Sequence, residues 1–148
     1  LNDGFAPYKV GAHRHTPEIE QTLSKIAGED VKVTFVPHLL PVNRGIVSTM
    51  YLKTTESLEK IHQVYADTYK NEKFVRVLKL GQAANLRNVR MTNNCQISLH
   101  KDEHTDTLIV VSTIDNMVKG AAGQAVQNMN IVCGFDEAAG LDIVCPAI

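Results

Sequence analysis

Strand-like segments interleaved with two amphipathic helical patterns constrain the fold of this 148-residue chain more than any other feature. Apolar residues at helical spacing predict helices at residues 17–27 and 56–70. Alternating or apolar runs predict strands at residues 31–37, 46–53, 75–79, 95–100 and 107–114. Strands at this density with two helices among them indicate an α+β fold, in which a mixed, mainly antiparallel sheet carries helices on one face.

The ends of the two helices also have sequence signals. Thr16 is predicted to cap the first helix, with Pro17 at its first position, and Gly28 is predicted to end it in the left-handed conformation. Thr54 or Thr55 is predicted to cap the second helix. Residues 119–130 are rich in small side chains, which permit close approach to another backbone or a ligand. A helical stripe there and just beyond is formed by Ala125, Val126, Met129, Val132 and Cys133.

Composition and charge exclude several classes of function. Lysine and arginine total 15 against 16 acidic residues, so the net charge is −1 and the pI is near 6.6. Such a chain offers no positive field for a nucleic acid, and no apolar run approaches the roughly 20 residues of a membrane-spanning helix. Three cysteines without CxxC spacing favour a reducing compartment. We therefore expect a cytoplasmic protein with neither a nucleic-acid nor a membrane partner.

The sequence His13-Arg14-His15 is the most unusual polar cluster. In an extended segment, His13 and His15 project to the same side, directly before the predicted helix. A histidine can act as a general acid or base near neutral pH, and a helix N-terminus favours its neutral form. Metal binding is an alternative, although this pattern supplies only two ligands. Two partly exposed histidines without a catalytic role are the third interpretation.

The loop at residues 37–45 is a second candidate for a site, because two prolines and a glycine stiffen it. It presents His38, Asn43 and Arg44. The planar guanidinium of Arg44 suits a carboxylate or a phosphate, and a surface ion pair is its alternative role.

Neither an evident nucleophile nor a nucleotide cradle accompanies these residues. Cys95, Cys133 and Cys145 lie in apolar or strand-like surroundings, so they are interpreted as structural. No GxGxxG or Walker loop is present. The residues by themselves therefore predict a substrate pocket, with no metal site assigned.

Three motifs together resemble a known family. They are Gly-Ala-His-Arg-His-Thr-Pro-Glu-Ile-Glu-Gln at residues 11–21, Pro-His-Leu-Leu-Pro-Val-Asn-Arg-Gly at residues 37–45, and Asp-Asn-Met-Val-Lys-Gly-Ala-Ala-Gly-Gln-Ala-Val-Gln-Asn-Met-Asn at residues 115–130. In this order they resemble the C-terminal part of the N-acetyl-gamma-glutamyl-phosphate reductases, and they span about the whole chain. The resemblance implies an architecture like the C-terminal domain of glyceraldehyde-3-phosphate dehydrogenase.

The resemblance also implies an activity in arginine biosynthesis. Reductases of this family convert N-acetyl-glutamyl 5-phosphate to N-acetyl-glutamate 5-semialdehyde with NADPH, through a cysteine thioester. Carried over residue by residue, the resemblance implies a catalytic role for His13 or His15 and a substrate-binding role for Arg14 and Arg44. It places three further residues on the cofactor side: Asn116, Gly120 and Gln124.

A larger protein is implied as well, because the family's Rossmann domain and nucleophilic cysteine precede the matched region. Residues 1–118 are expected to form a substrate-binding and dimerisation domain. Residues 119–148 are expected to form a terminal helix and tail that pack on the Rossmann domain. Without that domain the fragment is expected to be inactive, and its exposed apolar face is expected to favour self-association as a dimer or tetramer. A non-catalytic binding or interaction domain is the alternative, and a metal-dependent hydrolase is a third possibility.

Overall fold

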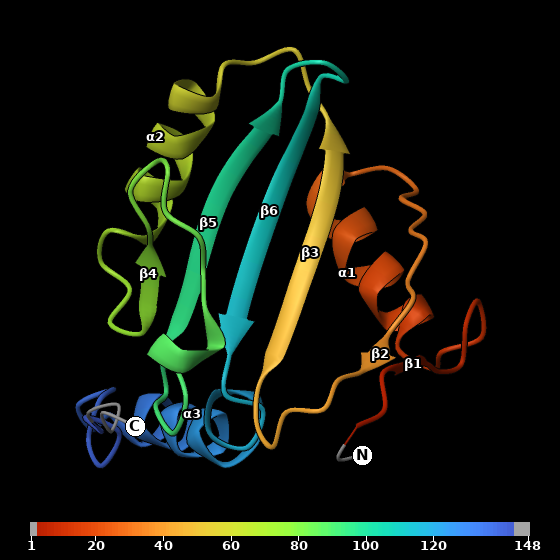
Figure 1. Cartoon of the computed structure of the whole chain (residues 1–148). Helices are drawn as coiled ribbons and strands as arrows, with labels where there is room; N and C mark the ends of the chain where they lie inside the picture. Colours follow the sequence, from red (N-terminus) through yellow and green to blue (C-terminus); the bar gives the residue numbers. More distant parts are fainter. Residues whose placement is uncertain (1–2, 144–148) are drawn as a thin grey trace. The chain divides into compact units, whose positions relative to one another are not determined.

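The computed structural model describes residues 3–143 and divides the chain into two compact units, residues 1–43 and 44–148 (Figure 1). The first unit contains β1 (Ala6–Pro7), α1 (Thr16–Ala27) and β2 (His38–Leu39). The second contains the remaining elements, β3 to β6 and α2 to α3. No helix within the described residues has the length and apolar character needed to cross a membrane.

The second unit is built on a four-stranded sheet with the strand order β3-β6-β5-β4. The long strands β3 (Ile46–Lys53), β6 (Thr107–Ile114) and β5 (Cys95–Asp102) are antiparallel to their neighbours. The short strand β4 (Val75–Val77) runs parallel to β5. The structure thus confirms the predicted mixed, mainly antiparallel sheet, with a β4 that is shorter than predicted and a β5 that is longer.

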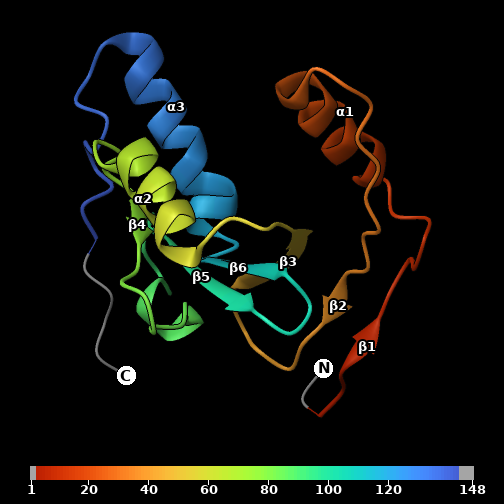
Figure 2. The same ribbon diagram turned by 90° about the horizontal axis from the view of Figure 1, so that it is seen from above.

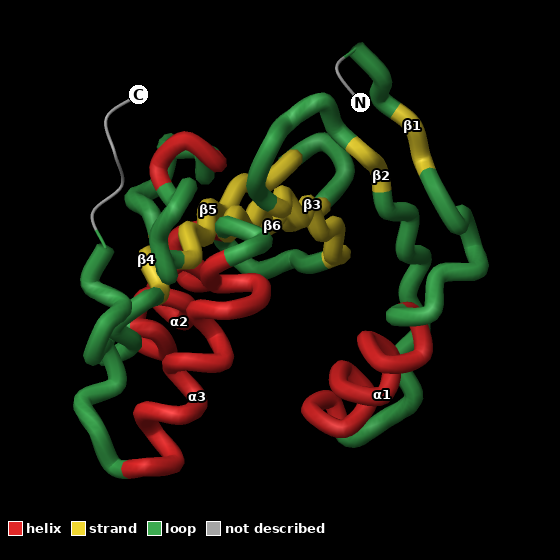
Figure 3. Tube along the Cα trace, turned by 90° about the horizontal axis from the view of Figure 1, so that it is seen from below, coloured by secondary structure: helices red, strands yellow, loops and turns green. Residues whose placement is uncertain are grey.

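One face of this sheet forms the main core against α2 (Leu58–Tyr69). Alternate residues of the two central strands are buried there because side chains of a strand project to opposite faces; they are Ile97, Leu99, Leu108 and Val110. The apolar stripe of α2 packs against them, as its helical spacing predicts: Leu58, Ile61, Tyr65 and Tyr69. Figures 2 and 3 show α2 and the terminal helix α3 on the same side of the sheet, which confirms helices on one face.

The C-terminal segment begins with a short π-helical stretch, η2 (Val118–Ala122), and continues as α3 (Gly123–Cys133). Close packing explains one of its glycines, because a Cβ added at Gly123 would lie 2.4 Å from Oδ1 of Asn93. The inward face of α3 is polar, with Gln127 and Asn130 buried. The predicted apolar stripe consequently lies largely outward.

Exposure of that stripe is pronounced toward the end of α3. Met129 is 50% exposed, Val132 is 85% exposed, and Cys133 is also exposed. Only Val126 of the stripe packs inward, against a small cluster made of Phe74, Ala138 and Leu141. The outward face of α3 is thus an exposed apolar surface of the second unit.

In the first unit, the strand predicted at residues 31–37 is absent. The segment does have the predicted alternation of half-buried and exposed residues, but it forms no strand, and its backbone hydrogen bond toward the β1 segment is at its end, where Tyr8 N donates to Pro37 O at 3.0 Å. Its amides instead bond to α1 side chains, since Val31 N donates to Ser24 Oγ at 2.8 Å and Val33 N donates to Glu20 Oε1 at 3.2 Å. The alternation of apolar and polar residues therefore predicted correctly which side chains turn inward. It predicted incorrectly that the backbone would bond to a neighbouring strand.

The helix caps need correction as well. Thr16 is the first residue of α1 rather than its cap, and His15 occupies the cap position without a side-chain cap hydrogen bond. Gly28 ends α1 with φ of 75°, as predicted. The cap of α2 is Ser57, whose Oγ accepts a hydrogen bond from Lys60 N, and not Thr54 or Thr55.

Candidate functional site

The two histidines of the first unit lie beside each other immediately before α1. His13 is 8% exposed and is the one buried residue among those described in this unit. Its ring lies edge-on to the rings of His15, Tyr8 and Phe35, at centroid distances of 4.8, 5.5 and 5.2 Å. Nδ1 of His13 accepts a hydrogen bond from the backbone N of His15 at 3.2 Å. Neutral His13 therefore carries its proton on Nε2.

The surroundings of His13 favour its neutral form. Burial lowers the pKa of His13 below the usual histidine value, and the positive charges of His15, Lys9 and Arg14 lower it further. In this tautomer the basic lone pair of the neutral imidazole is that of Nδ1, which already accepts the His15 amide, so His13 can take up a proton as a general base only when that hydrogen bond opens. The two imidazoles are brought together as predicted, although by a turn, in which Thr16 N donates to His13 O, and not by an extended segment.

The two arginines assigned to substrate binding have different environments. Arg14 is exposed between the histidines. Arg44 belongs to the second unit, where its Nη2 donates to Asp115 Oδ1 at 3.1 Å and its Nε lies 3.0 Å from Asp115 Oδ2. The Arg44 side chain is 24% exposed, whereas that of Asp115 is 0% exposed. The alternative role of Arg44, an ion pair, is thus present in the structure, with a partner that is buried rather than on the surface.

Asp115 is a buried charge that analysis of individual residues missed. Its Oδ2 accepts a hydrogen bond from Met91 N at 2.6 Å, and its Oδ1 accepts from Met117 N and Val118 N at 2.8 and 2.9 Å. Burial acts to raise the pKa of Asp115, but these amides and Arg44 outweigh it and hold the pKa below the usual value. The available signal was a carboxylate placed directly after an apolar strand.

The three residues that the resemblance places on the cofactor side lie in successive parts of the chain: Asn116 in the turn before η2, Gly120 within η2, and Gln124 in the first turn of α3. Asn116 and Gln124 are half-buried and Gly120 is exposed. Oδ1 of Asn116 accepts a hydrogen bond from Gly45 N at 2.7 Å, and Nε2 of Gln124 donates to Asn128 Oδ1 at 3.1 Å. Two of the three are therefore half-buried polar residues with partners within the chain, and the hydrogen bonds of the described residues do not join the three to one another.

The described residues contain no group of three or more histidine, cysteine or acidic side chains that could hold a metal ion. Of the cysteines, Cys95 is half-buried, with Sγ 3.7 Å from Ser112 Oγ, and Cys133 is exposed. Cys145 lies outside the described residues. The interpretation of the cysteines as structural therefore agrees with the surroundings of Cys95 but not with the exposure of Cys133.

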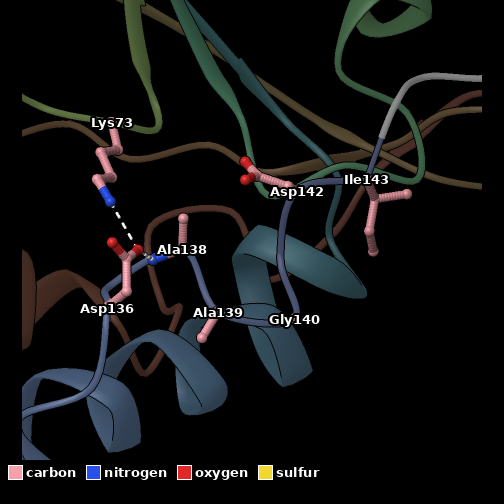
Figure 4. Close-up of a pocket in the computed structure, with 7 residues that line it drawn as sticks. All are labelled: Lys73, Asp136, Ala138, Ala139, Gly140, Asp142 and Ile143. Atoms are coloured by element: carbon pink, nitrogen blue, oxygen red, sulfur yellow. Dashed lines mark hydrogen bonds and ion pairs between the residues drawn. The ribbon is translucent and has the colours of Figure 1, made fainter.

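A cavity of about 510 Å³ lies in the second unit, near the end of the described chain (Figure 4). Its wall includes the ion pair of Lys73 Nζ and Asp136 Oδ1, which are 2.6 Å apart. Asp136 holds the pKa of Lys73 above its usual value, and Lys73 holds that of Asp136 below its own. None of the predicted site residues lines this cavity; its other residues are Ala138, Ala139, Gly140, Asp142 and Ile143.

Comparison with known proteins assigns the family. A family model described as the semialdehyde dehydrogenase dimerisation domain matches residues 1–116, which is most of the chain. The chain belongs to this family. Solved structures agree in fold: aspartate semialdehyde dehydrogenase from Francisella tularensis superposes with a TM-score of 0.67 at 15% identity, covering 88% of this chain and 39% of that one. The corresponding enzyme II from Vibrio cholerae gives a TM-score of 0.60 at 17% identity, covering 83% and 38%.

Curated relatives of this dimerisation domain are much more similar in sequence. The N-acetyl-gamma-glutamyl-phosphate reductase of Clostridium beijerinckii is 62% identical over 148 residues, covering 99% of this chain and 43% of the relative. The reductase of the same name from Brachyspira hyodysenteriae is 62% identical over 149 residues, covering 99% and 42%. The chain therefore spans less than half the length of the curated relatives it matches.

Proposed function

We propose that this chain is the substrate-binding and dimerisation part of an NADP-dependent N-acetyl-gamma-glutamyl-phosphate reductase of arginine biosynthesis, working in the cytoplasm. The overall reaction converts an acyl phosphate, NADPH and a proton to an aldehyde, NADP and inorganic phosphate. The thiolate and the main nucleotide-binding surface would come from the part of the reductase that precedes the matched region. The chain alone would then lack activity.

The observation that carries this proposal is the environment of His13 in a chain 62% identical to reductases of this name. The ring is buried among other rings, one nitrogen is fixed by the backbone of His15, and the pKa is lowered. A neutral imidazole held in one orientation suits the proton transfers that accompany loss of phosphate and formation of the aldehyde. His15, whose ring is exposed beside it, remains the second candidate for that role.

Substrate and cofactor would be contacted by other residues of the chain. Arg14 and Arg44 are proposed to bind the carboxylate or phosphate of the substrate. NADPH would supply the hydride. Asn116, Gly120 and Gln124 are proposed to contact this cofactor, because the amide side chains of Asn116 and Gln124 are only half-buried and Gly120 is exposed. The outward face of α3, including Val132, is proposed to pack on the nucleotide-binding domain, as the expected division at residue 118 requires.

Self-association is proposed to use β3. The family is described as a dimerisation domain, and β3 is an edge strand of the sheet with all eight residues exposed. Its apolar side chains include Val47 and Tyr51, which are 44% and 70% exposed. Burying such a strand against a second copy would remove both the apolar surface and the open edge from water. A dimer or a tetramer would result.

Light scattering at micromolar concentration tests self-association. We expect at least a dimer for the chain, and Val47→Asp should shift it toward the monomer because a charge would be buried at the contact. Val64→Asp is the matched control, since Val64 is 58% exposed on α2, away from the proposed interface. A monomeric wild-type chain would count against self-association through this domain.

Activity is best tested by grafting this chain in place of the matching segment of the Clostridium beijerinckii reductase. The graft is expected to reduce N-acetyl-glutamyl phosphate with NADPH. The reaction is followed by the loss of NADPH absorbance. His13→Asn or His15→Asn should lower turnover roughly 10²–10⁴-fold, the range for a lost general acid or base. Gln63→Asn, at an exposed position of α2, is the control variant and should leave the folding and the turnover of the graft unchanged.

The outcomes separate the competing functions. A folded graft without wild-type turnover would favour a non-catalytic binding or interaction domain. Wild-type rates in both histidine variants would remove the histidines from the mechanism. Loss of turnover on chelation, restored by a divalent metal, would instead support the metal-dependent alternative.

A further inference from the structure

The ion pair between Arg44 and Asp115 has an asymmetric geometry that bears on substrate recognition. Two nitrogens of the guanidinium, Nε and Nη2, face the two carboxylate oxygens at 3.0 and 3.1 Å. A guanidinium is a rigid planar fork with five N–H donors on two usable edges. The carboxylate occupies one edge, and the orientation of the other edge is thereby fixed.

The carboxylate itself is held rigidly. Three backbone amides from two separate segments donate to it, those of Met91, Met117 and Val118, at 2.6–2.9 Å. The side chain of Asp115 is 0% exposed, so rotation would leave several buried donors without an acceptor. The neighbouring residue Asn116 accepts a hydrogen bond through its Oδ1 from the backbone N of Gly45, the residue after Arg44. The position of Arg44 is therefore set by both its side chain and its backbone.

The second edge of Arg44 carries the donors that the ion pair does not use. Within residues 3–143, no hydrogen bond is formed by Nη1 of Arg44, and 24% of the side chain reaches solvent. A free, oriented pair of N–H groups on a permanently charged residue matches two oxygens of a carboxylate or phosphate. A surface arginine in a simple ion pair would not be backed by a fully buried partner.

We propose that Asp115 is a positioning residue that holds Arg44 by one edge so that the other edge binds an oxyanion of the substrate. This inference rests on the proposed function, because it takes the substrate to be the anionic acyl phosphate. Asp115 does not touch the substrate and acts only through Arg44. The oxyanion is either the phosphate or the carboxylate of the same molecule, and the two can be distinguished kinetically.

The test uses the grafted reductase in the reverse direction, with the semialdehyde, NADP and inorganic phosphate as substrates. Arg44→Lys keeps the charge, but a lysine cannot bind the Asp115 carboxylate and a substrate oxyanion with two separate edges. We therefore expect the KM of one substrate to rise about 10- to 100-fold with kcat changed little. A raised KM for phosphate assigns the phosphate, and a raised KM for the semialdehyde assigns the carboxylate. Arg76→Lys makes the same substitution at an exposed arginine on β4 and should leave both KM values unchanged.

Asp115→Asn is then measured alone and combined with Arg44→Lys. A residue that acts through Arg44 raises the same KM alone, but adds little in the Arg44→Lys background. Additive effects, or a loss of folded protein with unchanged KM values, would show that Asp115 is only structural and would overturn the inference. Unchanged KM values in Arg44→Lys would overturn it even if Asp115→Asn does not fold. If the wild-type graft catalyses the reaction, these contrary results for the variants overturn this inference alone. If the wild-type graft is inactive, the proposed function and the inference fail together.

Discussion

The two units of the chain differ in how much apolar surface they bury. Residues 44–148 contain a sheet, a covering helix and two clusters of buried apolar residues. Among the described residues of the first unit only His13 is buried, and α1 has no buried residue at all. The one side chain that the first unit withdraws from water is thus polar. The apolar core thus lies in the second unit, whereas the buried residue of the first unit is a histidine.

Polar groups in the two units are also held differently. Asp115 in the second unit is fixed by three amides and an arginine. His13 in the first unit is fixed by one backbone hydrogen bond and by ring contacts. If His13 exchanges protons as proposed, this lighter restraint leaves room for both of its protonation states. A site that must hold a charge in place benefits from saturation with hydrogen bonds.

The largest expected effect tests the contrast in apolar packing. Leu99→Ala in the main core should lower the free energy of unfolding by about 2–5 kcal/mol, because it leaves a cavity between the sheet and α2. The same change at Leu23, which is 39% exposed on α1, should cost under about 1 kcal/mol. Urea denaturation followed by circular dichroism measures both. Equal losses of unfolding free energy in the two variants would show that the two units do not differ in apolar packing.

The next effect concerns the close approach of the terminal helix within the second unit. Gly123→Ala should cost about 1–3 kcal/mol, because its Cβ would lie 2.4 Å from Asn93 Oδ1. Gly120→Ala is the matched control, since the nearest atoms to its Cβ would be 3.5 Å away. Thermal unfolding of the two variants gives the difference, and similar melting temperatures would show that this packing is looser than the structure indicates.

A smaller effect tests the corrected helix cap. Ser57→Ala should destabilise the second unit by about 1 kcal/mol, because Lys60 N would lose its acceptor. Thr55→Ala removes a hydroxyl from a residue that does not cap α2 and should change stability by less than about 0.5 kcal/mol. The reverse order in denaturant midpoints would restore the original prediction for this cap.

The smallest effect is a pH dependence confined to the first unit. Because the pKa of His13 is lowered in the folded state, the unfolded chain takes up this proton first as the pH falls. Stability from this group is therefore present above the ordinary histidine pKa, and declines as the pH falls through it toward the lowered value. Amide hydrogen exchange, corrected for its intrinsic pH dependence, should show growing loss of protection around Phe35 but not around Leu99. A uniform loss would place the effect elsewhere.

Sequence patterns predicted the second unit better than the first. The helical stripe ending at Tyr69 was predictable because it packs against the core of the sheet. The strand at residues 46–53 formed by pairing with β6, although all eight of its residues are exposed. The strand expected at residues 31–37 failed because Ser24 and Glu20 supply acceptors that compete with a neighbouring strand. Alternation reports which side chains turn inward, and it does not report where the backbone bonds.

The candidate site was predictable in part for a similar reason. His13 and His15 stand out as residue types, and their spacing brought them together by a turn instead of a strand. The partner of Arg44 could not be found from residue types alone, because Asp115 is 71 positions away in sequence. Its role depends on a junction of three segments that exists only in the folded chain.

The pH dependence of kcat/KM for the grafted reductase shows whether His13 or His15 carries its proton transfers. If this chain supplies the acid and base chemistry, the wild-type profile should fall on its acid side below the ordinary histidine pKa, near 6.5. One of the two variants, His13→Asn or His15→Asn, should lose that acid limb and show a rate reduced roughly 10²–10⁴-fold. Wild-type rates with the same acid limb in both variants would contradict the account.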